Sequence, residues 1–311
     1  MLEGLHWIAA DWGTSALRVW GMDAQANVLA HRHSDQGMGK LRSGDYTQAL
    51  LSLIEDWLPE SAPSPFRVVI CGMAGARQGW IEAPYRQVPC TPVDWRESVQ
   101  APCPDPRLAV RILPGLSQLT PADVMRGEET QIAGWLLEAG TADAVLCLPG
   151  THSKWVDVRA GEVQRFVTYM TGEHYALLAE QSVLRHSLTD EAAAPALPTE
   201  VSDNVFIDAV RHVLDAPERF CAGLFSLRAR HLLQGEGAST LRARLSGWVI
   251  GVELAASRQW WQSRDVILIG NPALARRYQL ALDTAGGKGI LADGEELALA
   301  GLCAAWKHSA A

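Results

Sequence analysis

Residues 8–20 read IAADWGTSALRVW and place a short polar turn between two strand-like segments. The apolar run before Asp11 is typical of a buried strand, and the alternation over residues 16–22 is typical of a second strand. Glycine loops of the Walker and dinucleotide-binding types run from a strand into a helix, so this turn belongs to a different kind of fold. By itself it fits either an ordinary hairpin or a turn that binds phosphate.

The same layout occurs a second time in the chain. Residues 143–170 read DAVLCLPGTHSKWVDVRAGEVQRFVTYM and repeat the order of strand, hydroxyl-containing turn, strand, turn and strand seen over residues 8–32. Hairpins are common, so coincidence is the alternative explanation. The repeat favours two similar lobes, each opening with a three-stranded meander.

Between and after these meanders, helices and strands alternate. The pattern predicts helices at 45–58 and 121–140, a mostly helical region at 171–262 and a closing helix at 292–306. Further strands are predicted at 66–76, 107–116 and 265–270, the last followed by a helix that starts at Pro272. The most loop-like segment is 189–200.

Composition narrows the class of protein. A length of 311 residues favours two domains, and a net charge of -8 argues against a general binder of nucleic-acid backbones. The six cysteines show neither C-x-x-C pairing nor zinc-ligand spacing. No stretch is long and apolar enough to span a membrane, and the first residues lack signal-peptide features, so we expect a cytoplasmic protein.

Five motifs together resemble one known family. They read ADWGTSALRVW, CGMAGARQGWIEAPY, MRGEETQIAGW, LPGTHSKWV and ILIGNPALARRY, and the resemblance extends from residue 10 to about residue 301. In this order and wording they resemble the 2-dehydro-3-deoxygalactonokinases, a family of the sugar kinase, hsp70 and actin superfamily.

The resemblance implies an α/β protein of two ribonuclease H-like lobes, the actin-like ATPase fold, with a cleft between them. The expected N-terminal lobe is 1–138, with a C-terminal helix at about 295–311 packing back on it. The expected C-terminal lobe is 139–294, with a helical insertion at about 171–240. In the C-terminal helix, Gly301 would allow close packing against a partner helix.

The implied activity is transfer of the ATP γ-phosphoryl group to the C6 hydroxyl of 2-dehydro-3-deoxy-D-galactonate, in D-galactonate catabolism. The expected ligands are therefore ATP, Mg²⁺ and a small sugar acid, with neither nucleic acid nor membrane as a partner and a homodimer as an option. Kinases of other sugars or sugar acids, such as 2-dehydro-3-deoxygluconate, and a non-kinase actin-like ATPase or binding protein are the alternatives.

The two turns carry the expected phosphate site. Glycine lets backbone N–H groups approach phosphate oxygens, and hydroxyl side chains add donors. Asp11 repels phosphate directly but can hold Mg²⁺ through water. The second turn has Leu148 and Pro149 where many superfamily members have an acidic residue, which leaves its part in metal binding open. The candidate ATP-binding residues are Asp11, Gly13, Thr14, Ser15, Gly150, Thr151, Ser153, Gly270 and Asn271.

The catalytic base is expected in RGEETQ. Superfamily kinases carry a carboxylate at the start of the helix that follows the last strand of the first lobe, where it accepts the proton of the attacking hydroxyl. Glu128 or Glu129 would take this role, with Glu128 slightly favoured. Alternatively, both are acidic residues that stabilise the first turn of a helix.

A 2-oxo acid substrate needs a group that binds its carboxylate, and arginine offers bidentate geometry for it. For any single arginine, a structural ion pair is the alternative. A lysine after the second turn could contact phosphate or carboxylate as a point charge. The candidate substrate-binding residues are Arg18, Gly37, Lys40, Arg77, Trp80, Arg126, His152, Lys154 and Tyr169, with His174 as a weaker one.

Overall fold

The computed structural model describes residues 1–61, 63–189 and 199–309. The chain divides into two compact units: unit 1 comprises Met1–Asp143, Val158–Arg165 and Gly294–Ala311, and unit 2 comprises Ala144–Asp157 and Phe166–Asp293. The division falls five residues after the expected boundary at 138, and residues 158–165, expected in the second lobe, group with unit 1. Most of the expected loop at 189–200 lies outside the described residues.

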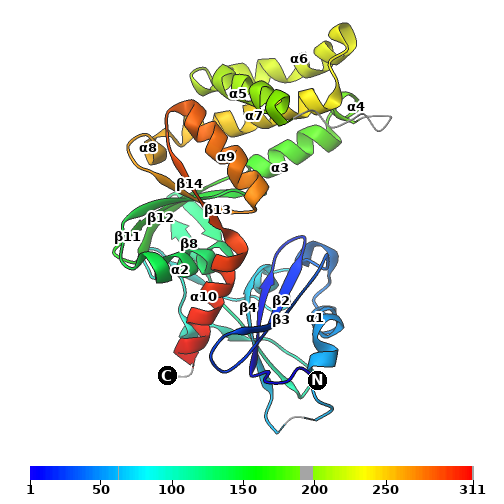
Figure 1. Cartoon of the computed structure of the whole chain (residues 1–311), viewed down its shortest axis with the longest axis vertical. Helices are drawn as coiled ribbons and strands as arrows, with labels where there is room; N and C mark the ends of the chain where they lie inside the picture. The colour runs from blue at the N-terminus through cyan, green and yellow to red at the C-terminus, as the bar shows by residue number, and fades with distance from the viewer. Residues whose placement is uncertain (62, 190–198, 310–311) are drawn as a thin grey trace. The chain divides into compact units, whose positions relative to one another are not determined.

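Unit 1 is built on a six-stranded sheet in the order β3-β2-β1-β4-β7-β6 (Figure 1). β1 runs antiparallel to β2, and β2 runs antiparallel to β3, as the opening meander predicted. β4 and β7 extend the sheet in parallel to β1. The strands are β1 (Trp7–Trp12), β2 (Leu17–Met22), β3 (Val28–Ser34), β4 (Phe66–Gly72), β6 (Val99–Gln100) and β7 (Leu108–Ile112).

Strand β1 is buried on both faces of the sheet, because its alternate residues belong to two cores. Ile8, Ala10 and Trp12 pack with residues of α1 (Tyr46–Ile54). Trp7 and Ala9 point to the other face and pack with the C-terminal helix α10 (Gly294–Ser309). The Trp7 ring stacks on Trp306 of α10 at a centroid distance of 4.8 Å. Asp11 has the same parity as Trp7 and Ala9 and therefore points to the α10 face.

Helix α2 (Glu128–Ala139) packs along α10 within unit 1. Two glycines allow this contact: a methyl group on Gly301 would collide with the Thr130 carbonyl, and one on Gly134 would collide with Leu297. Close packing at Gly301 is therefore as expected.

The prediction of a helix at 121–140 is wrong for residues 121–127. A small sheet of order β5-β8-β9 occupies this part of the chain, with strands β5 (Tyr85–Gln87), β8 (Gly115–Leu119) and β9 (Ala122–Met125). α2 begins only at Glu128, directly after Gly127, whose φ of +107° is incompatible with a continuous helix. The acidic, helix-favouring residues after Gly127 made the sequence pattern place the start of the helix earlier than it lies.

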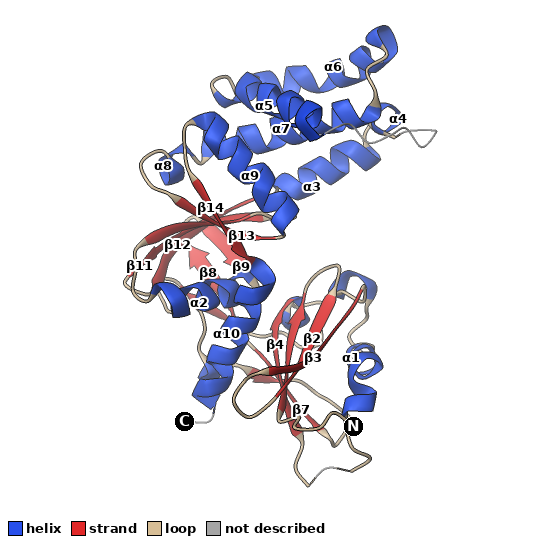
Figure 2. Ribbon diagram, viewed as in Figure 1, coloured by secondary structure: helices blue, strands red, loops and turns tan. Residues whose placement is uncertain are grey.

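Unit 2 repeats the strand order of unit 1 with a five-stranded sheet, β12-β11-β10-β13-β14 (Figure 2). β13 runs parallel to β10 and to β14. The repeat predicted from the two meanders is confirmed, since in both sheets the first four strands have the order 3-2-1-4 and one further strand follows the fourth. The strands are β10 (Ala144–Leu148), β11 (Ser153–Arg159), β12 (Glu162–Tyr169), β13 (Val266–Gly270) and β14 (Gly289–Asp293).

The remainder of unit 2 is mainly helical, as predicted. Helix α7 is central because it packs against α3, α5, α6 and α9. One core joins the sheet to these helices through Trp155, Phe206, Trp248 and Tyr278. The helices are α3 (Thr171–Ala176), α4 (Arg185–Leu188), α5 (Thr199–Leu214), α6 (Arg219–Gln234), α7 (Ala238–Ala256), α8 (Arg258–Trp261) and α9 (Pro272–Ala285). No helix of the described residues has the length and apolarity needed to cross a membrane.

Candidate active site

The first turn of unit 1 is held by the loop that follows β3. The Gly13 N–H donates to the Ala16 carbonyl at 2.9 Å and closes the turn, while the Met38 N–H donates to the Gly13 carbonyl at 3.0 Å. Gly37 lies so close to the turn that a methyl group there would reach within 2.5 Å of the Ala16 nitrogen. Gly37 therefore supports the turn from behind.

Thr14 and Ser15 are exposed at the tip of this turn. Their hydroxyls and the neighbouring backbone are therefore accessible to a ligand. Lys40 instead forms a surface ion pair with Asp35 at 2.5 Å.

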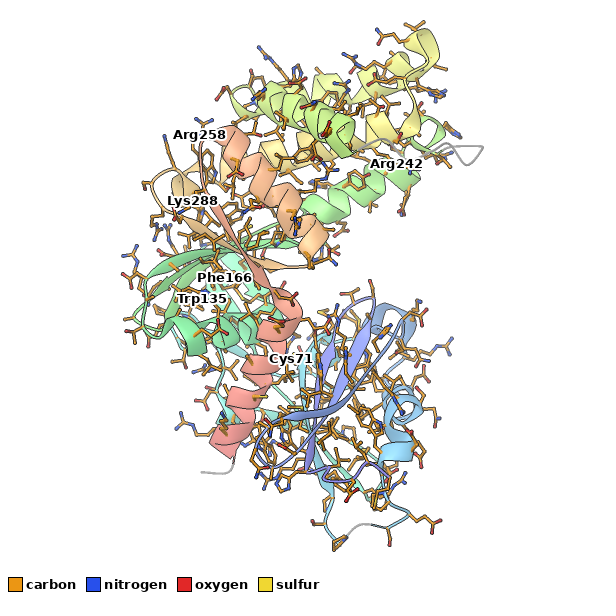
Figure 3. All side chains as sticks on the ribbon, in the orientation of Figure 1. Cys71, Trp135, Phe166, Arg242, Arg258 and Lys288 are labelled. Atoms are coloured by element: carbon orange, nitrogen blue, oxygen red, sulfur yellow. The ribbon has the colours of Figure 1, made fainter. Side chains whose placement is uncertain are left out.

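Asp11 lies between two partners on neighbouring strands. The strand register places it opposite Arg18 on β2 and Cys71 on β4. Arg18 Nη1 donates to Asp11 Oδ2 at 3.0 Å, and the Cys71 thiol, labelled in Figure 3, lies 3.7 Å from Oδ1. Burial raises the pKa of Asp11, and the Arg18 guanidinium opposes that rise.

A cavity of about 160 Å³ opens beside Asp11 within unit 1. It brings together the ends of β1 and β4, the segment before α2, and the first turn of α2. Its lining residues are Asp11, Gly13, Gly72, Met73, Arg126, Gly127, Glu128, Gln131 and Ala298. The sequence analysis singled out four of these residues, from motifs more than 100 residues apart.

Glycines shape the wall of this cavity. Gly72 has a φ of +87°, and a methyl group there would lie 2.6 Å from the Trp12 carbonyl. A methyl group on Gly127 would lie 3.3 Å from the Gly72 Cα. The backbone thus brings the start of α2 close to the end of β4, which in turn lies against the end of β1.

The two candidate bases have different surroundings. Glu128 lines the cavity, and its Oε2 accepts a hydrogen bond from the backbone N–H of Arg126 at 3.1 Å. Glu129 is fully buried, and its oxygens accept from the Gly127 N–H at 2.7 Å and from Thr130 Oγ1 at 3.1 Å. Burial, with the nearby charge of Glu128, raises the pKa of Glu129 to about 8. Of the two, only Glu128 is among the described residues that line the cavity.

Arg126 is a buried cation with unfilled hydrogen-bonding capacity. It is 8% exposed, and its Nη2 donates to the Ala83 carbonyl at 2.8 Å. The guanidinium lies 4.2 Å from the centroid of the Tyr85 ring. Its Nε and Nη1 atoms are buried without a hydrogen-bond partner in the described structure. Because leaving such donors unpaired is costly, the arrangement suits an anionic ligand in the adjoining cavity.

Other residues predicted to bind substrate have structural partners. Arg18 bridges Asp11 and Glu295, the latter at 3.1 Å. The Arg77 side chain is 81% exposed and lies 3.7 Å from Glu82. Trp80 is a core residue: its ring packs with Trp12 and Tyr46, so it does not present an open face for a sugar.

In unit 2, the second turn packs on the start of α3. The Glu173 N–H donates to the Thr151 carbonyl at 3.0 Å, and a methyl group on Gly172 would lie 2.8 Å from the Thr151 Cα. Thr151 is exposed and Gly150 is half-buried. Ser153, in contrast, is fully buried, and its hydroxyl lies 2.7 Å from that of Tyr278. The structure thus uses the Ser153 hydroxyl internally.

The remaining candidates in unit 2 lie around this turn. His152 Nε2 lies 2.5 Å from Glu173 Oε2, and the ammonium of buried Lys154 donates to the His152 carbonyl at 2.9 Å. Tyr169 is half-buried against the core, and His174 is exposed. Lys154 therefore stabilises the turn directly.

A mostly apolar pocket of about 160 Å³ lies beside the second turn, within unit 2. Its lining residues are Gly150, Thr171, Gly172, Tyr175, Ser246, Val249, Ile250, Leu274 and Tyr278. Apart from Gly150, the sequence analysis missed these residues, because they lie on three helices whose apolar spacing is typical of core. The GNP stretch gave one usable signal, since Leu274 follows it in the first turn of α9.

Gly270 and Asn271 lie at the junction of β13 and α9. A methyl group on Gly270 would lie 3.3 Å from the Pro149 carbonyl, so the glycine allows two strand ends to approach. Asn271 Oδ1 accepts from the Ala273 N–H at 3.0 Å and caps α9, with Pro272 as the first helical residue. The described residues contain no group of three or more histidine, cysteine or acidic side chains suited to a metal ion.

Comparison with known proteins identifies the family. The family model described as 2-keto-3-deoxy-galactonokinase matches residues 11–305. A curated protein of Rhizobium meliloti named as a 2-dehydro-3-deoxygalactonokinase is 39% identical over 305 residues, 96% of each chain. The chain belongs to the 2-keto-3-deoxy-galactonokinase family. Membership of this family makes it a sugar-acid kinase with ATP as co-substrate, and the resemblance seen in the sequence is confirmed.

Further relatives agree with this 2-keto-3-deoxy-galactonokinase assignment. The 2-dehydro-3-deoxygalactonokinase of Escherichia coli is 34% identical over 284 residues, 90% of each chain. A crystal structure of a Sinorhizobium meliloti protein named as a 2-dehydro-3-deoxygalactonokinase has a TM-score of 0.86 at 38% identity. The match covers 97% of this chain and 96% of the Sinorhizobium meliloti chain.

More distant structures define the fold. The activator of the 2-hydroxyisocaproyl-CoA dehydratase from Clostridium difficile, solved with bound ADPNP, has a TM-score of 0.50 at 13% identity and covers 98% of this chain and 96% of its own. At that identity the likeness shows the fold alone. The predicted actin-like ATPase fold is confirmed for this member of the 2-keto-3-deoxy-galactonokinase family.

Proposed function

We propose that this chain transfers the γ-phosphoryl group of ATP to the C6 hydroxyl of 2-dehydro-3-deoxy-D-galactonate. The products are 2-dehydro-3-deoxy-6-phospho-D-galactonate and ADP, in D-galactonate catabolism. Family membership supports the reaction class and the sugar acid. The single observation that carries the assignment of residues is the cavity of unit 1, which Asp11, Arg126 and Glu128 line together.

Glu128 is the proposed catalytic base. A base must first lie within reach of the proton it accepts, and only then does its pKa matter. Glu128 meets the first condition because it lines the cavity, whereas Glu129 is buried with both oxygens hydrogen-bonded. Glu128 would accept the proton of the C6 hydroxyl and orient that oxygen for in-line attack.

Arg126 is the proposed group that binds the substrate carboxylate. Its Nε and Nη1 atoms lack hydrogen-bond partners among the described residues, so the guanidinium has N–H donors left for a carboxylate. Tyr85 and the Ala83 carbonyl hold the guanidinium in place before substrate binds. Preorganisation of this kind reduces the entropy lost on binding.

Each unit, taken by itself, carries groups that suit part of ATP. In unit 1, the turn over Gly13, Thr14 and Ser15 offers backbone donors and exposed hydroxyls to phosphate. In unit 2, the apolar pocket lined by Val249 and Leu274, among others, suits a flat purine base. Thr151 and Gly150 at the second turn are further candidates for phosphate contact.

The chemistry of Asp11 fits Mg²⁺ held through water. One carboxylate beside a phosphate-binding turn is sufficient, because Mg²⁺ keeps several waters and takes other ligands from the phosphates. When bound there, Mg²⁺ would neutralise charge on the transferring phosphoryl group. Arg18 would keep Asp11 ionised, which a cation site requires.

A coupled assay of ADP release tests the proposal. Purified protein is given MgATP with 2-dehydro-3-deoxy-D-galactonate, its C4 epimer, gluconate and galactonate in separate reactions. The proposal predicts ADP release that depends on the galactonate-derived 2-oxo acid. An equal, slow rate with and without every acceptor contradicts it, and turnover of the epimer alone moves the assignment to another sugar-acid kinase.

A further inference from the structure

Glu253 is a buried acidic residue that the proposed reaction does not use. It lies on α7 and is 2% exposed. Burying a carboxyl group is costly unless its oxygens accept hydrogen bonds. The hydrogen bonds of Glu253 therefore indicate what the residue does.

Three donors from three other elements converge on this carboxyl. Trp155 Nε1 on β11 donates to Oε1 at 2.7 Å. The Tyr278 hydroxyl on α9 donates to Oε2 at 2.6 Å, and the hydroxyl of Thr171 at the start of α3 donates to the same oxygen. Ser153, at the end of the second turn, joins this network through Tyr278, because the two hydroxyls lie 2.7 Å apart.

A carboxyl group suits this position better than an amide. An indole N–H can only donate, and each carboxylate oxygen has two lone pairs, so one carboxylate accepts from all three donors. Glutamine would place an amide N–H₂ against at least one side of the cluster and force the hydroxyls there to reorient.

The same elements form the walls of the apolar pocket. Thr171 and Tyr278 line it directly, while Val249 and Ile250 lie about one helical turn before Glu253 on α7. Gly172, which follows Thr171, packs on the second turn. A methyl group added to Gly172 would lie 2.8 Å from the Thr151 Cα. The carboxyl therefore ties α3, α7, α9 and the second turn to one point.

We infer that Glu253 is a positioning residue for the nucleotide: by accepting hydrogen bonds from Thr171, Tyr278 and Trp155, it fixes the pocket walls for ADP and ATP. Through Tyr278 and Ser153 it also fixes the second turn. Glu253 acts through its neighbours and does not touch the reacting groups. The inference rests on the proposed placement of the purine base in this pocket. It predicts that loss of the carboxylate weakens nucleotide binding and leaves sugar-acid binding unchanged, because the proposed sugar-acid groups belong to unit 1.

Calorimetric titration with ADP tests the inference on the full chain. Glu253→Gln keeps the shape of the side chain, and we expect ADP to bind about tenfold more weakly, which corresponds to about 1.4 kcal/mol. In steady-state assays the KM for ATP rises by a similar factor, and the KM for the sugar acid does not change.

The matched control is Asp157→Asn. Asp157 is another buried carboxylate of unit 2, 1% exposed on β11, and Arg264 Nη1 donates to it at 3.1 Å. The substitution should lower the melting temperature without changing ADP affinity. If Asp157→Asn weakens ADP binding as much as Glu253→Gln does, a general structural effect explains both, and the inference is overturned.

A second pair of variants decides the matter if Glu253→Gln does not fold. Thr171→Val removes the donating hydroxyl and Thr171→Ser restores it, so ADP should bind weakly to the first and nearly normally to the second. Equal affinities for the two variants, or wild-type affinity in folded Glu253→Gln, overturn the inference. Since ADP binding needs no acceptor, a protein that binds ADP but phosphorylates no sugar acid would contradict the proposed function alone.

Discussion

Arg126 and Glu128 lie on either side of Gly127, and both line the same cavity at the start of α2. The backbone N–H of Arg126 donates to Glu128 Oε2 at 3.1 Å. A guanidinium with two nitrogens that lack partners and a carboxylate therefore line one cavity at the start of α2. This pairing suits an acidic substrate that must also lose a proton, and it leads to the following predictions.

Glu128→Gln should lower kcat by roughly 10²–10⁴-fold with little change in ATP affinity, because general-base catalysis contributes about that much. Glu129→Gln is the matched variant one residue away and should retain most of the activity. Both are measured by coupled ADP release at saturating ATP. Normal kcat in Glu128→Gln would remove this residue from the role of base.

Glu129 should make stability dependent on pH. Its pKa is raised from 4.5 to about 8, so the folded state holds the proton more tightly than the unfolded state does. The resulting stabilisation is complete below about pH 4.5 and is lost as pH rises to about 8. Melting temperatures measured from pH 5 to 8 should fall more steeply for the wild type than for Glu129→Gln. Parallel curves would show that Glu129 does not titrate in this way.

Arg126→Met should raise the KM for the sugar acid by at least tenfold, since hydrogen bonds to a charged group contribute about 1.5–3 kcal/mol. The KM for ATP should change little. Arg77→Met provides the control, because the Arg77 side chain is 81% exposed. If Arg77→Met impairs sugar-acid binding and Arg126→Met does not, the assignment of the carboxylate-binding arginine is reversed.

Gly37→Ala should weaken ATP binding, because the added methyl group would lie 2.5 Å from the Ala16 nitrogen and displace the first turn. The φ of Gly37 is -71°, so the expected effect comes from the collision and not from backbone strain. Gly44→Ala is the control in the next loop, where an added methyl group meets nothing within 4 Å. We expect at least a tenfold rise in the KM for ATP for the first variant only; equal KM values would contradict the supporting role of Gly37.

Arg18→Met should shift the pH profile of activity. Burial raises the pKa of Asp11, and Arg18 opposes that rise, while Cys71 and Glu295 are the other titratable groups near it. Without Arg18 the pKa rises further, so Asp11 becomes protonated at a higher pH. If activity needs ionised Asp11, the acidic limb of kcat/KM moves to higher pH. An unmoved acidic limb would exclude Asp11 as the group that titrates there.

The three-stranded meander that opens each sheet was predictable from the sequence because it carries strong local signals. Alternating residues around Gly13, and again around Gly150, specify hairpins without long-range information. The start of α2 was not predictable in the same way, because residues 121–127 are compatible with a helix until Gly127 adopts a positive φ. That conformation depends on close packing against Gly72, which lies on a distant strand.

The site was predictable only in part for a related reason. Motif resemblance singled out Asp11, Arg126 and Glu128, but burial distinguishes Glu128 from Glu129, and burial is a property of the folded chain. Ser153 was expected to donate to phosphate because it lies in the second turn. Its actual partner, Tyr278, is 125 positions away in the sequence and could not be foreseen. Glu253 gave no signal in the sequence, since a single acidic residue on an apolar helix is common.

The central claim is phosphoryl transfer to one particular oxygen, and phosphorus–proton correlation NMR of the reaction product tests it most directly. The wild-type protein is incubated with MgATP and 2-dehydro-3-deoxy-D-galactonate, and the product is examined without separation. We expect a phosphomonoester whose phosphorus couples to the two C6 protons, in amounts equal to the ADP formed. Free phosphate as the only new phosphorus species, or coupling to a proton at another carbon, would contradict it.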